Sequence, residues 1–170
     1  MKDALAIHRW LLAHQVHHEI VRLPHPLTCA DDLPETLRVP PGMCVGVTVF
    51  DVTSHTGRNP VAVVGPVSSP PSPGVICLLL SAQRVRTASA FAINAATDYA
   101  AGLVCPLLLP DDLPVLVDER IGQVPEVHTP TGERRTALSL SSTDLLALVP
   151  GKSVDLTPAP GPATTLPVAH

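Results

Sequence analysis

Apolar and polar residues follow short, distinct patterns along this chain, and these patterns predict a sheet-rich fold with a few helices. The stretch 3–17 places its apolar side chains on one helical stripe, so we expect a helix there. Residues 44–52 and 61–67 are apolar and rich in β-branched side chains, which is typical of buried strands. The turn-like stretch 54–59 between them predicts a hairpin.

The middle of the chain predicts two strands and a helix. The apolar run 75–80 predicts a buried strand, and the alternating stretch 83–88 predicts a half-exposed one. Residues 89–101 are rich in alanine and predict a helix that stops at Gly102. Residues 68–74 contain three prolines and predict a loop.

Further elements are predicted on either side of this region. Thr28 and Asp31 have the spacing of a capping box, so we expect a helix to begin there and to end before the Pro-Pro-Gly sequence at 40–42. The last predicted elements are a strand at 113–119, a hairpin at 126–140 with its turn near Gly132, and a capped helix at 141–149.

The order of these elements indicates the fold class and the domain organisation. Strands and helices do not alternate regularly, so an α+β fold with a mixed sheet is expected rather than a doubly wound one. We expect one domain over residues 1–150. Residues 151–170 are rich in proline and lack aromatic side chains, which predicts a disordered tail.

Composition limits the class of protein. A net charge of -4 argues against a general nucleic-acid binder such as a DNA-binding protein. The four cysteines form no C-x-x-C pair, and the N-terminal stretch carries an acid and a histidine among its apolar residues, unlike a signal peptide. No run of 18 apolar residues occurs, so no membrane span is expected. We expect a cytoplasmic protein with free thiols and no membrane partner.

Common catalytic signatures are absent from the sequence. His14, His17 and His18 have spacings that allow metal binding, but no H-E-x-x-H motif accompanies them, and a solvent-exposed helix end explains them more simply. No G-x-S-x-G elbow or phosphate loop is present. Cys105 precedes a proline and has no neighbouring cation to stabilise a thiolate. We therefore expect no metal and no cofactor.

Gly102 and Pro106 allow two interpretations. A glycine after an alanine-rich helix, with a proline shortly beyond it, is a common way to end a helix. A glycine turn also leaves backbone N–H groups unshielded, and such groups can stabilise an oxyanion. The two interpretations are compatible.

An ordered set of short motifs resembles the YbaK-like aminoacyl-tRNA editing domain, which is also inserted in bacterial prolyl-tRNA synthetases. The motifs are HPLT at 25–28, VGVTVF at 45–50, GLVCP at 102–106, LPVLVDE at 113–119 and the segment 132–149. The resemblance spans residues 5–149 and is weakest over 53–98. It implies a mainly antiparallel, partly barrel-like sheet with flanking helices, and hydrolysis of the ester of mischarged tRNA.

The resemblance also implies which residues form the site. It assigns the catalytic loop to Gly102 and Pro106, with the terminal ribose hydroxyl of the tRNA assisting the attacking water. We expect this loop to face a cavity lined by the strand of Val47. The expected substrate-binding residues are Val47, Thr48, Leu103, Val104, Cys105, His25 and Asp118. Pocket size, set by residues such as Val47 and Val49, would provide selectivity, because one methylene is worth about 1–3 kcal/mol.

One position departs from the family pattern. Relatives carry a lysine before the threonine of this strand, and the resemblance implies that it binds the 3′-terminal phosphate or the substrate; here the residue is Val47. The only lysines are Lys2 and Lys152, so an arginine would have to replace it, and the candidates are Arg58, Arg84, Arg86, Arg134 and Arg135. Arg84 and Arg86 share one strand face by alternation, although a solvated surface would explain them as well.

The sequence therefore favours an aminoacyl-tRNA deacylase that acts in trans on the aminoacylated 3′ end of tRNA and supports translation fidelity. A catalytically inactive homologue that binds a ligand, a tRNA end or a protein is the main alternative. A hydrolase of another small acyl ester is a third possibility.

Overall fold

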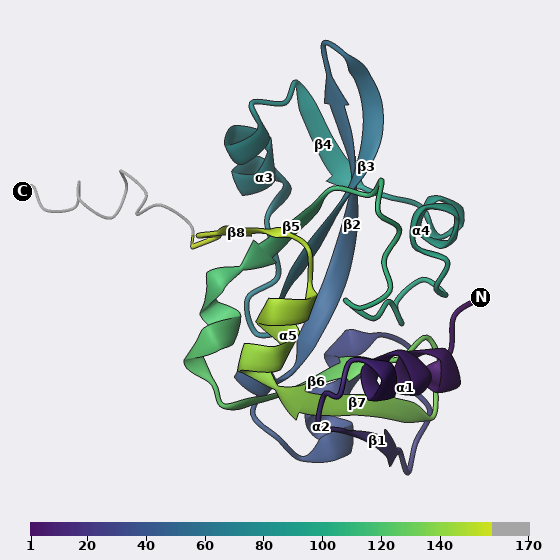
Figure 1. Cartoon of the computed structure of the whole chain (residues 1–170). Helices are drawn as coiled ribbons and strands as arrows, with labels where there is room; N and C mark the ends of the chain where they lie inside the picture. Colours follow the sequence, from purple (N-terminus) through teal and green to yellow (C-terminus); the bar gives the residue numbers. More distant parts are fainter. Residues whose placement is uncertain (158–170) are drawn as a thin grey trace, which may run out of the picture.

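The computed structural model describes residues 1–157 and contains two β-sheets (Figure 1). The smaller sheet has the strand order β1-β7-β6 and is antiparallel throughout. The larger sheet has the order β4-β2-β3-β5-β8, in which β5 and β8 run parallel to their neighbours. The strands are β1 (His18–Arg22), β2 (Val45–Ser54), β3 (Gly57–Pro66), β4 (Arg84–Thr87), β5 (Val115–Asp118), β6 (Glu126–Pro130), β7 (Thr136–Ser141) and β8 (Lys152–Val154). The predicted α+β class with a mainly antiparallel arrangement is confirmed.

Short helices cover the sheets, and their ends follow local signals. Helix α1 is capped by Asp3, whose carboxylate accepts the Ala6 N–H at 2.9 Å. Helix α5 is capped by Ser141, as the sequence predicts. The helices are α1 (Ala4–Ala13), α2 (Leu33–Leu37), α3 (Pro73–Leu80), α4 (Ala90–Thr97) and α5 (Ser142–Leu148), with 3-10 turns at Ala30–Asp32, Pro41–Met43 and Glu119–Gln123.

The main hydrophobic core joins both sheets to α1 and α5. Ile7 and Leu11 from α1 are fully buried, as are Leu138 from β7 and Leu145 from α5. Tyr99 is the largest fully buried side chain, and its hydroxyl donates to the Leu107 carbonyl at 2.6 Å. This bond ties the segment after α4 to the core, so that segment is held in place although it has no regular structure.

The predicted hairpin of β2 and β3 is confirmed, and it positions the site. The two strands pair antiparallel from Val45 with Pro66 to Ser54 with Gly57. The strands predicted at 83–88 and 113–119 and the hairpin predicted at 126–140 also form, as β4, β5 and the β6–β7 pair.

The predicted strand at 75–80 is wrong, because these residues belong to helix α3. Pro73 occupies the first turn of this helix, a position that favours helix initiation, and Leu78 remains 82% exposed. A short apolar run does not by itself distinguish a buried strand from a helix.

Two predicted helices are shorter than expected. Helix α1 ends at Ala13, because Gln15 adopts a positive φ of 57° and the chain then turns into β1 at His18. Helix α4 ends at Thr97, because Asp98 adopts a left-handed conformation, so the turn that leads to Gly102 begins earlier than predicted.

The capping pattern assigned to Thr28 and Asp31 is shifted by one residue. The Asp32 carboxylate accepts the backbone N–H groups of Thr28 at 2.8 Å and of Cys29 at 3.3 Å. Asp32 therefore caps this turn, and the Asp31 carboxylate takes no part in it.

The predicted disordered tail starts too early. Lys152–Val154 form β8, which pairs parallel with β5, and Leu156 is only 5% exposed. A buried leucine and an added sheet strand stabilise this segment despite its proline-rich surroundings. The remainder of the predicted tail, 158–170, lies outside the described residues.

Candidate functional site

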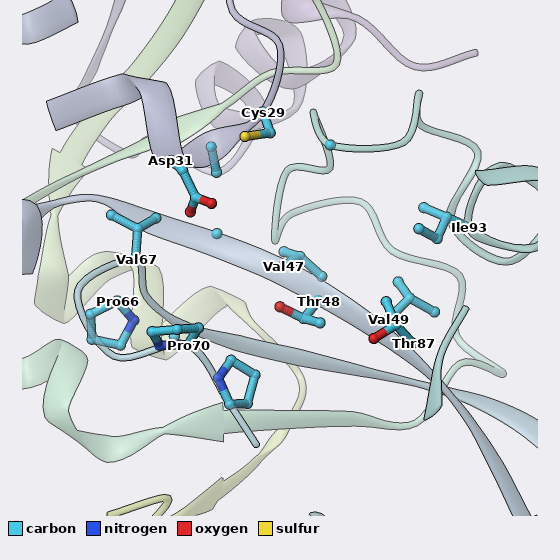
Figure 2. Close-up of a pocket in the computed structure, with 15 residues that line it drawn as sticks. Cys29, Asp31, Val47, Thr48, Val49, Pro66, Val67, Pro70, Thr87 and Ile93 are labelled. Atoms are coloured by element: carbon cyan, nitrogen blue, oxygen red, sulfur yellow. The ribbon is translucent and has the colours of Figure 1, made fainter. Parts of the chain in front are cut away.

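A cavity of about 350 Å³ opens beside β2, between the segment after β1 and the loop after β3 (Figure 2). Residues from six parts of the chain meet here: the turn 29–31, the strand residues 46–49, the proline-containing segment 65–71, the end of β4 at 87, helix α4 at 93 and the glycine at 102. The lining residues are Cys29, Ala30, Asp31, Gly46, Val47, Thr48, Val49, Gly65, Pro66, Val67, Pro70, Pro71, Thr87, Ile93 and Gly102. The cavity expected between Gly102 and the Val47 strand is therefore present.

The backbone of Val47 lies on an open strand edge. The β2–β4 ladder begins only at Phe50, so no strand lies beside Val47 on that side. The Ala88 N–H donates to the Val49 carbonyl at 3.0 Å and shows that odd-numbered residues of β2 direct their polar backbone groups away from β3. Within residues 1–157, neither the N–H nor the carbonyl of Val47 has a hydrogen-bond partner. These groups are available to a ligand.

Gly102 joins the loop after α4 to the turn at 29–31. It has a positive φ of 84°, and its carbonyl accepts the Ala30 N–H at 3.0 Å. A Cβ at this position would lie 2.8 Å from the Thr28 carbonyl oxygen. Only glycine therefore permits this close approach without a shift of the backbone. The contact between Gly102 and the turn at 28–30 holds the wall that contains Asp31 in place beside the cavity.

The remaining residues of the Gly102-x-x-x-Pro106 loop do not line the cavity. Leu103, Val104, Cys105 and Pro106 are buried in the core, and the Leu103 N–H already donates to the Ala100 carbonyl at 3.0 Å. Burial raises the pKa of the Cys105 thiol to about 11, so this side chain is a neutral core group. The loop holds Gly102 in place, while its own side chains form the packing beneath.

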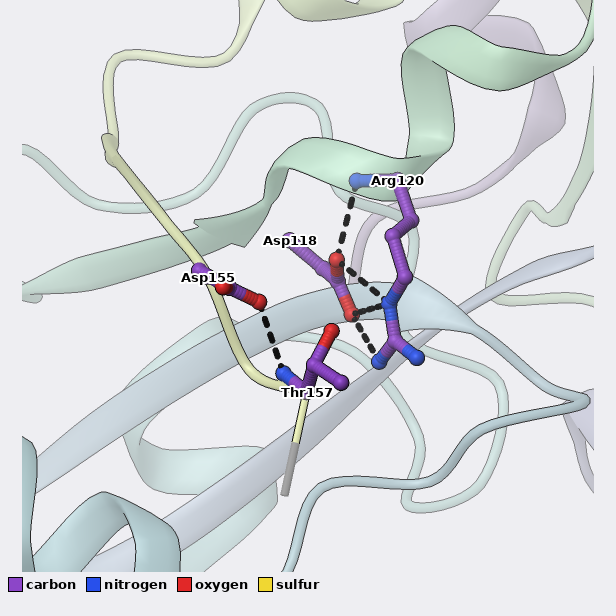
Figure 3. Close-up of polar contacts among 4 residues, drawn as sticks. All are labelled: Asp118, Arg120, Asp155 and Thr157. Atoms are coloured by element: carbon purple, nitrogen blue, oxygen red, sulfur yellow. Dashed lines mark hydrogen bonds and ion pairs between the residues drawn. The ribbon is translucent and has the colours of Figure 1, made fainter. Parts of the chain in front are cut away.

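Asp118 is engaged in a buried ion pair (Figure 3). Its carboxylate is 1% exposed and accepts from the Arg120 guanidinium, with an Nη2–Oδ2 distance of 2.7 Å, and from the Arg120 backbone N–H at 2.9 Å. Nearby, the Asp155 carboxylate accepts the Thr157 N–H at 2.9 Å, which lowers the pKa of Asp155. Asp118 lies outside the cavity and stabilises the end of β5.

The histidines also lie apart from the cavity. His25 is exposed and is not among the lining residues. His14 contacts the Trp10 carbonyl through Nδ1 at 2.8 Å, and His18 Nε2 lies 2.8 Å from His8 Nδ1. Within residues 1–157, no three His, Cys, Asp or Glu side chains are grouped as a metal site would require.

Among residues 1–157, Asp31 is the only charged side chain that lines the cavity. Figure 2 shows its carboxylate turned toward β2, with the Cys29 thiol on the same wall. Sequence reasoning named Val47, Thr48 and Gly102 but missed this wall, because the capping pattern assigned a local role to Asp31. It also missed Pro70 and Pro71, whose sequence indicates only a loop.

Two arginines lie outside the cavity on strand β4 of the larger sheet. Arg84 and Arg86 of β4 are opposite Thr53 and Asp51 of β2, on the face that Val47 and Val49 share by alternation. Asp51 is paired with Arg58. Arg84 and Arg86 are exposed, and over residues 1–157 neither forms a salt bridge. Their charges are available to an anionic partner.

Comparison with known protein families identifies the family of this chain. The family model of the aminoacyl-tRNA editing domain matches residues 25–148, which include the cavity-lining residues. This chain belongs to the aminoacyl-tRNA editing domain family. The resemblance inferred from the ordered motifs is thereby confirmed. No relative was found among curated proteins.

Solved structures show the same fold as this editing domain. A structure described as "a putative trans-editing enzyme for prolyl tRNA synthetase" is 24% identical, with a TM-score of 0.70 over 84% of this chain and 88% of that chain. The hypothetical protein APE2540 is 21% identical, with a TM-score of 0.76 over 88% of this chain and 97% of that chain. A scaffold protein from a computational epitope-grafting study is 22% identical, with a TM-score of 0.76 over 92% and 97% of the two chains. At these identities the likeness shows the fold. No helix among the described residues is long and apolar enough to cross a membrane.

Proposed function

We propose that this editing domain hydrolyses the ester bond of mischarged aminoacyl-tRNA in trans. The observation that carries the proposal is the single cavity that Gly102 shares with Val47 and Thr48. Its volume of about 350 Å³ is within the range of small-ligand pockets and suits an aminoacyl group attached to a ribose. Membership of the editing family supports the same substrate class.

Water is the proposed nucleophile. Its oxygen attacks the ester carbonyl carbon, the bond to the ribose oxygen breaks, and the ribose oxygen leaves with a proton, giving a free amino acid and tRNA. The open Val47 N–H can donate to the oxyanion that develops on the carbonyl. The Thr48 hydroxyl has no hydrogen-bond partner within residues 1–157 and can position the water. An aminoacyl ester is already activated, so positioning and these donors supply much of what hydrolysis requires.

The cysteines are poorly suited to a covalent mechanism. Cys105 is buried, with its pKa raised to about 11. The Cys29 thiol lines the cavity, but no cationic side chain lines it to stabilise a thiolate. These conditions favour direct attack by water.

We assign the phosphate contact of the missing family lysine to Arg84 and Arg86. Val47 cannot bind a phosphate, whereas these two arginines lie on the same sheet face as Val47 and form no salt bridge within residues 1–157; the charge of Arg86 also helps to lower the pKa of Asp51 opposite it. A tRNA 3′ end seated in the cavity would then continue along β4.

The test is deacylation of a panel of mischarged tRNAs, including alanyl- and cysteinyl-tRNA(Pro), by the purified chain. We expect ester loss above the buffer rate on at least one substrate. Thr48→Val should lower kcat/KM about tenfold or more, as expected for a lost hydrogen bond in the transition state. Thr53→Val, on the same strand but outside the cavity, is the control. No hydrolysis of any substrate would refute the deacylase.

A catalytically inactive binding module is the second candidate, favoured by Val47 and by the absence of a cation in the cavity. Saturable binding of tRNA without hydrolysis would support it. Val47→Lys separates the two candidates further. If Arg84 and Arg86 supply the phosphate contact, Val47→Lys should leave kcat/KM of an active enzyme nearly unchanged. Appearance of hydrolysis in an otherwise inactive chain would show that the catalytic geometry is retained and that only this charge-assisted contact was lost.

A further inference from the structure

Asp31 is an exposed residue in the 3-10 turn Ala30–Asp32, and no contact among the described residues holds its carboxylate. The neighbouring Asp32 accepts the N–H groups of Thr28 and Cys29 and caps the turn. Within residues 1–157, the Asp31 carboxylate forms no hydrogen bond and no salt bridge. It lines the cavity from the wall opposite β2, and its side chain is turned toward that strand.

In the part of the chain that the structure describes, no other charged side chain lines the cavity. Its walls are formed by apolar side chains, prolines, glycines, two threonines and one thiol. Arg84 and Arg86 of β4 are not lining residues. The cavity is therefore an acidic site, with open backbone groups of β2 across from one carboxylate. A ligand that matches these groups has a positively charged group close to a carbonyl group.

An aminoacyl ester has this arrangement of groups. Its α-ammonium is one carbon away from the ester carbonyl, so a carbonyl held at the β2 edge leaves the ammonium free to point across the cavity. We propose that Asp31 binds the α-ammonium of the aminoacyl group and makes the site selective for substrates with a free amino group. This inference rests on the proposed function, because it places the aminoacyl end in this cavity.

The consequence is a defined substrate preference. An N-acylated aminoacyl ester, such as a formylated, acetylated or peptidyl-tRNA, has no α-ammonium and leaves the Asp31 carboxylate without a partner. It also places a neutral amide against that carboxylate. Asp31 thus discriminates against blocked amino groups, whereas the dimensions of the cavity discriminate among side chains.

The experiment compares free and N-acetylated forms of the same aminoacyl-tRNA with wild type and with Asp31→Asn. For the free substrate, Asp31→Asn should reduce kcat/KM about tenfold, the effect of one lost charge-assisted hydrogen bond. Acetylation should reduce wild-type turnover by a similar factor, and Asp31→Asn should then have no further effect. Glu35→Gln, an exposed acid on α2 outside the cavity, controls for the loss of one negative charge.

Binding provides a readout that does not require hydrolysis. Aminoacyl and N-acetyl-aminoacyl 3′-amides of adenosine, which resist cleavage, are titrated by calorimetry into wild type and Asp31→Asn. Tighter binding of the free amine that disappears in Asp31→Asn supports the inference even if no deacylation occurs. Equal binding of both compounds by wild type, or an equal effect of Asp31→Asn on both, would overturn it. Loss of hydrolysis with retained selectivity in binding would refute only the deacylase.

Discussion

Replacement of Gly102 by alanine tests the contact that closes the cavity wall. The new Cβ would lie 2.8 Å from the Thr28 carbonyl oxygen and 3.3 Å from the Cys29 Cβ. A non-glycine residue at a positive φ costs about 1–2 kcal/mol, and overpacking adds about 1–3 kcal/mol, so we expect the free energy of unfolding to fall by roughly 2–5 kcal/mol. The nearest atom belongs to the backbone, so a side-chain rotation cannot relieve the overlap.

Gly57→Ala is the matched control for this substitution. Gly57 also has a positive φ, but an added Cβ there would meet nothing within 4 Å. Urea unfolding should therefore show only the backbone penalty for Gly57→Ala, about 1–3 kcal/mol, without loss of deacylation. Gly102→Ala should lose both stability and deacylation, measured at a temperature where circular dichroism shows it folded. Full deacylase activity in folded Gly102→Ala would refute the role assigned to this contact.

Three further predictions concern the tRNA surface, the last strand and a buried histidine. Replacing both Arg84 and Arg86 by glutamine should weaken tRNA binding, measured by filter binding. The slope of the logarithm of the binding constant against the logarithm of salt concentration should fall in magnitude by about 1–2, and an unchanged slope would exclude the two arginines as phosphate contacts. Leu156→Ala should cost about 2–4 kcal/mol in urea unfolding because the side chain is buried, whereas Leu78→Ala at an 82% exposed position should stay within about 0.5 kcal/mol; similar costs would contradict the packing of the segment that follows β8. Burial lowers the pKa of His128, so the folded state favours the neutral imidazole. The contribution of His128 to stability should therefore be present above about pH 6.5 and should be lost as the pH falls through the lowered pKa. Wild type should then lose more stability than His128→Gln between about pH 7.5 and pH 5, and equal losses would remove His128 as the cause.

Elements defined by neighbouring residues could be predicted from the sequence. The β2–β3 hairpin follows from two β-branched runs joined by a polar turn, and α5 follows from the serine that caps it. Errors arose where a local pattern fits two structures. The run 75–80 is apolar enough for a strand, but α3 leaves Leu78 exposed, because only one side of the helix packs against the sheet.

The candidate site could be predicted only in part, because some of its residues belong to recognisable local motifs and others do not. The ordered motifs indicated Gly102, Val47 and Thr48, and these residues do meet at one cavity. Asp31 was not indicated, because the one-residue difference between Asp31 and Asp32 as the cap is decided by the backbone geometry of the turn. Asp118 was indicated, but a buried pairing with Arg120 occupies its carboxylate.

The sequence by itself determined the β2–β3 hairpin, the capped helix α5 and the family, because each depends on residues close together in the chain or on their order. Tertiary structure alone decided that Asp31, Val47 and Gly102 surround one cavity and that Lys152–Val154 add a strand to the larger sheet. The physical reason is that both outcomes depend on packing between distant segments. The approach of Gly102 to Thr28 and the open edge of β2 beside Val47 exist only once the two sheets share a core.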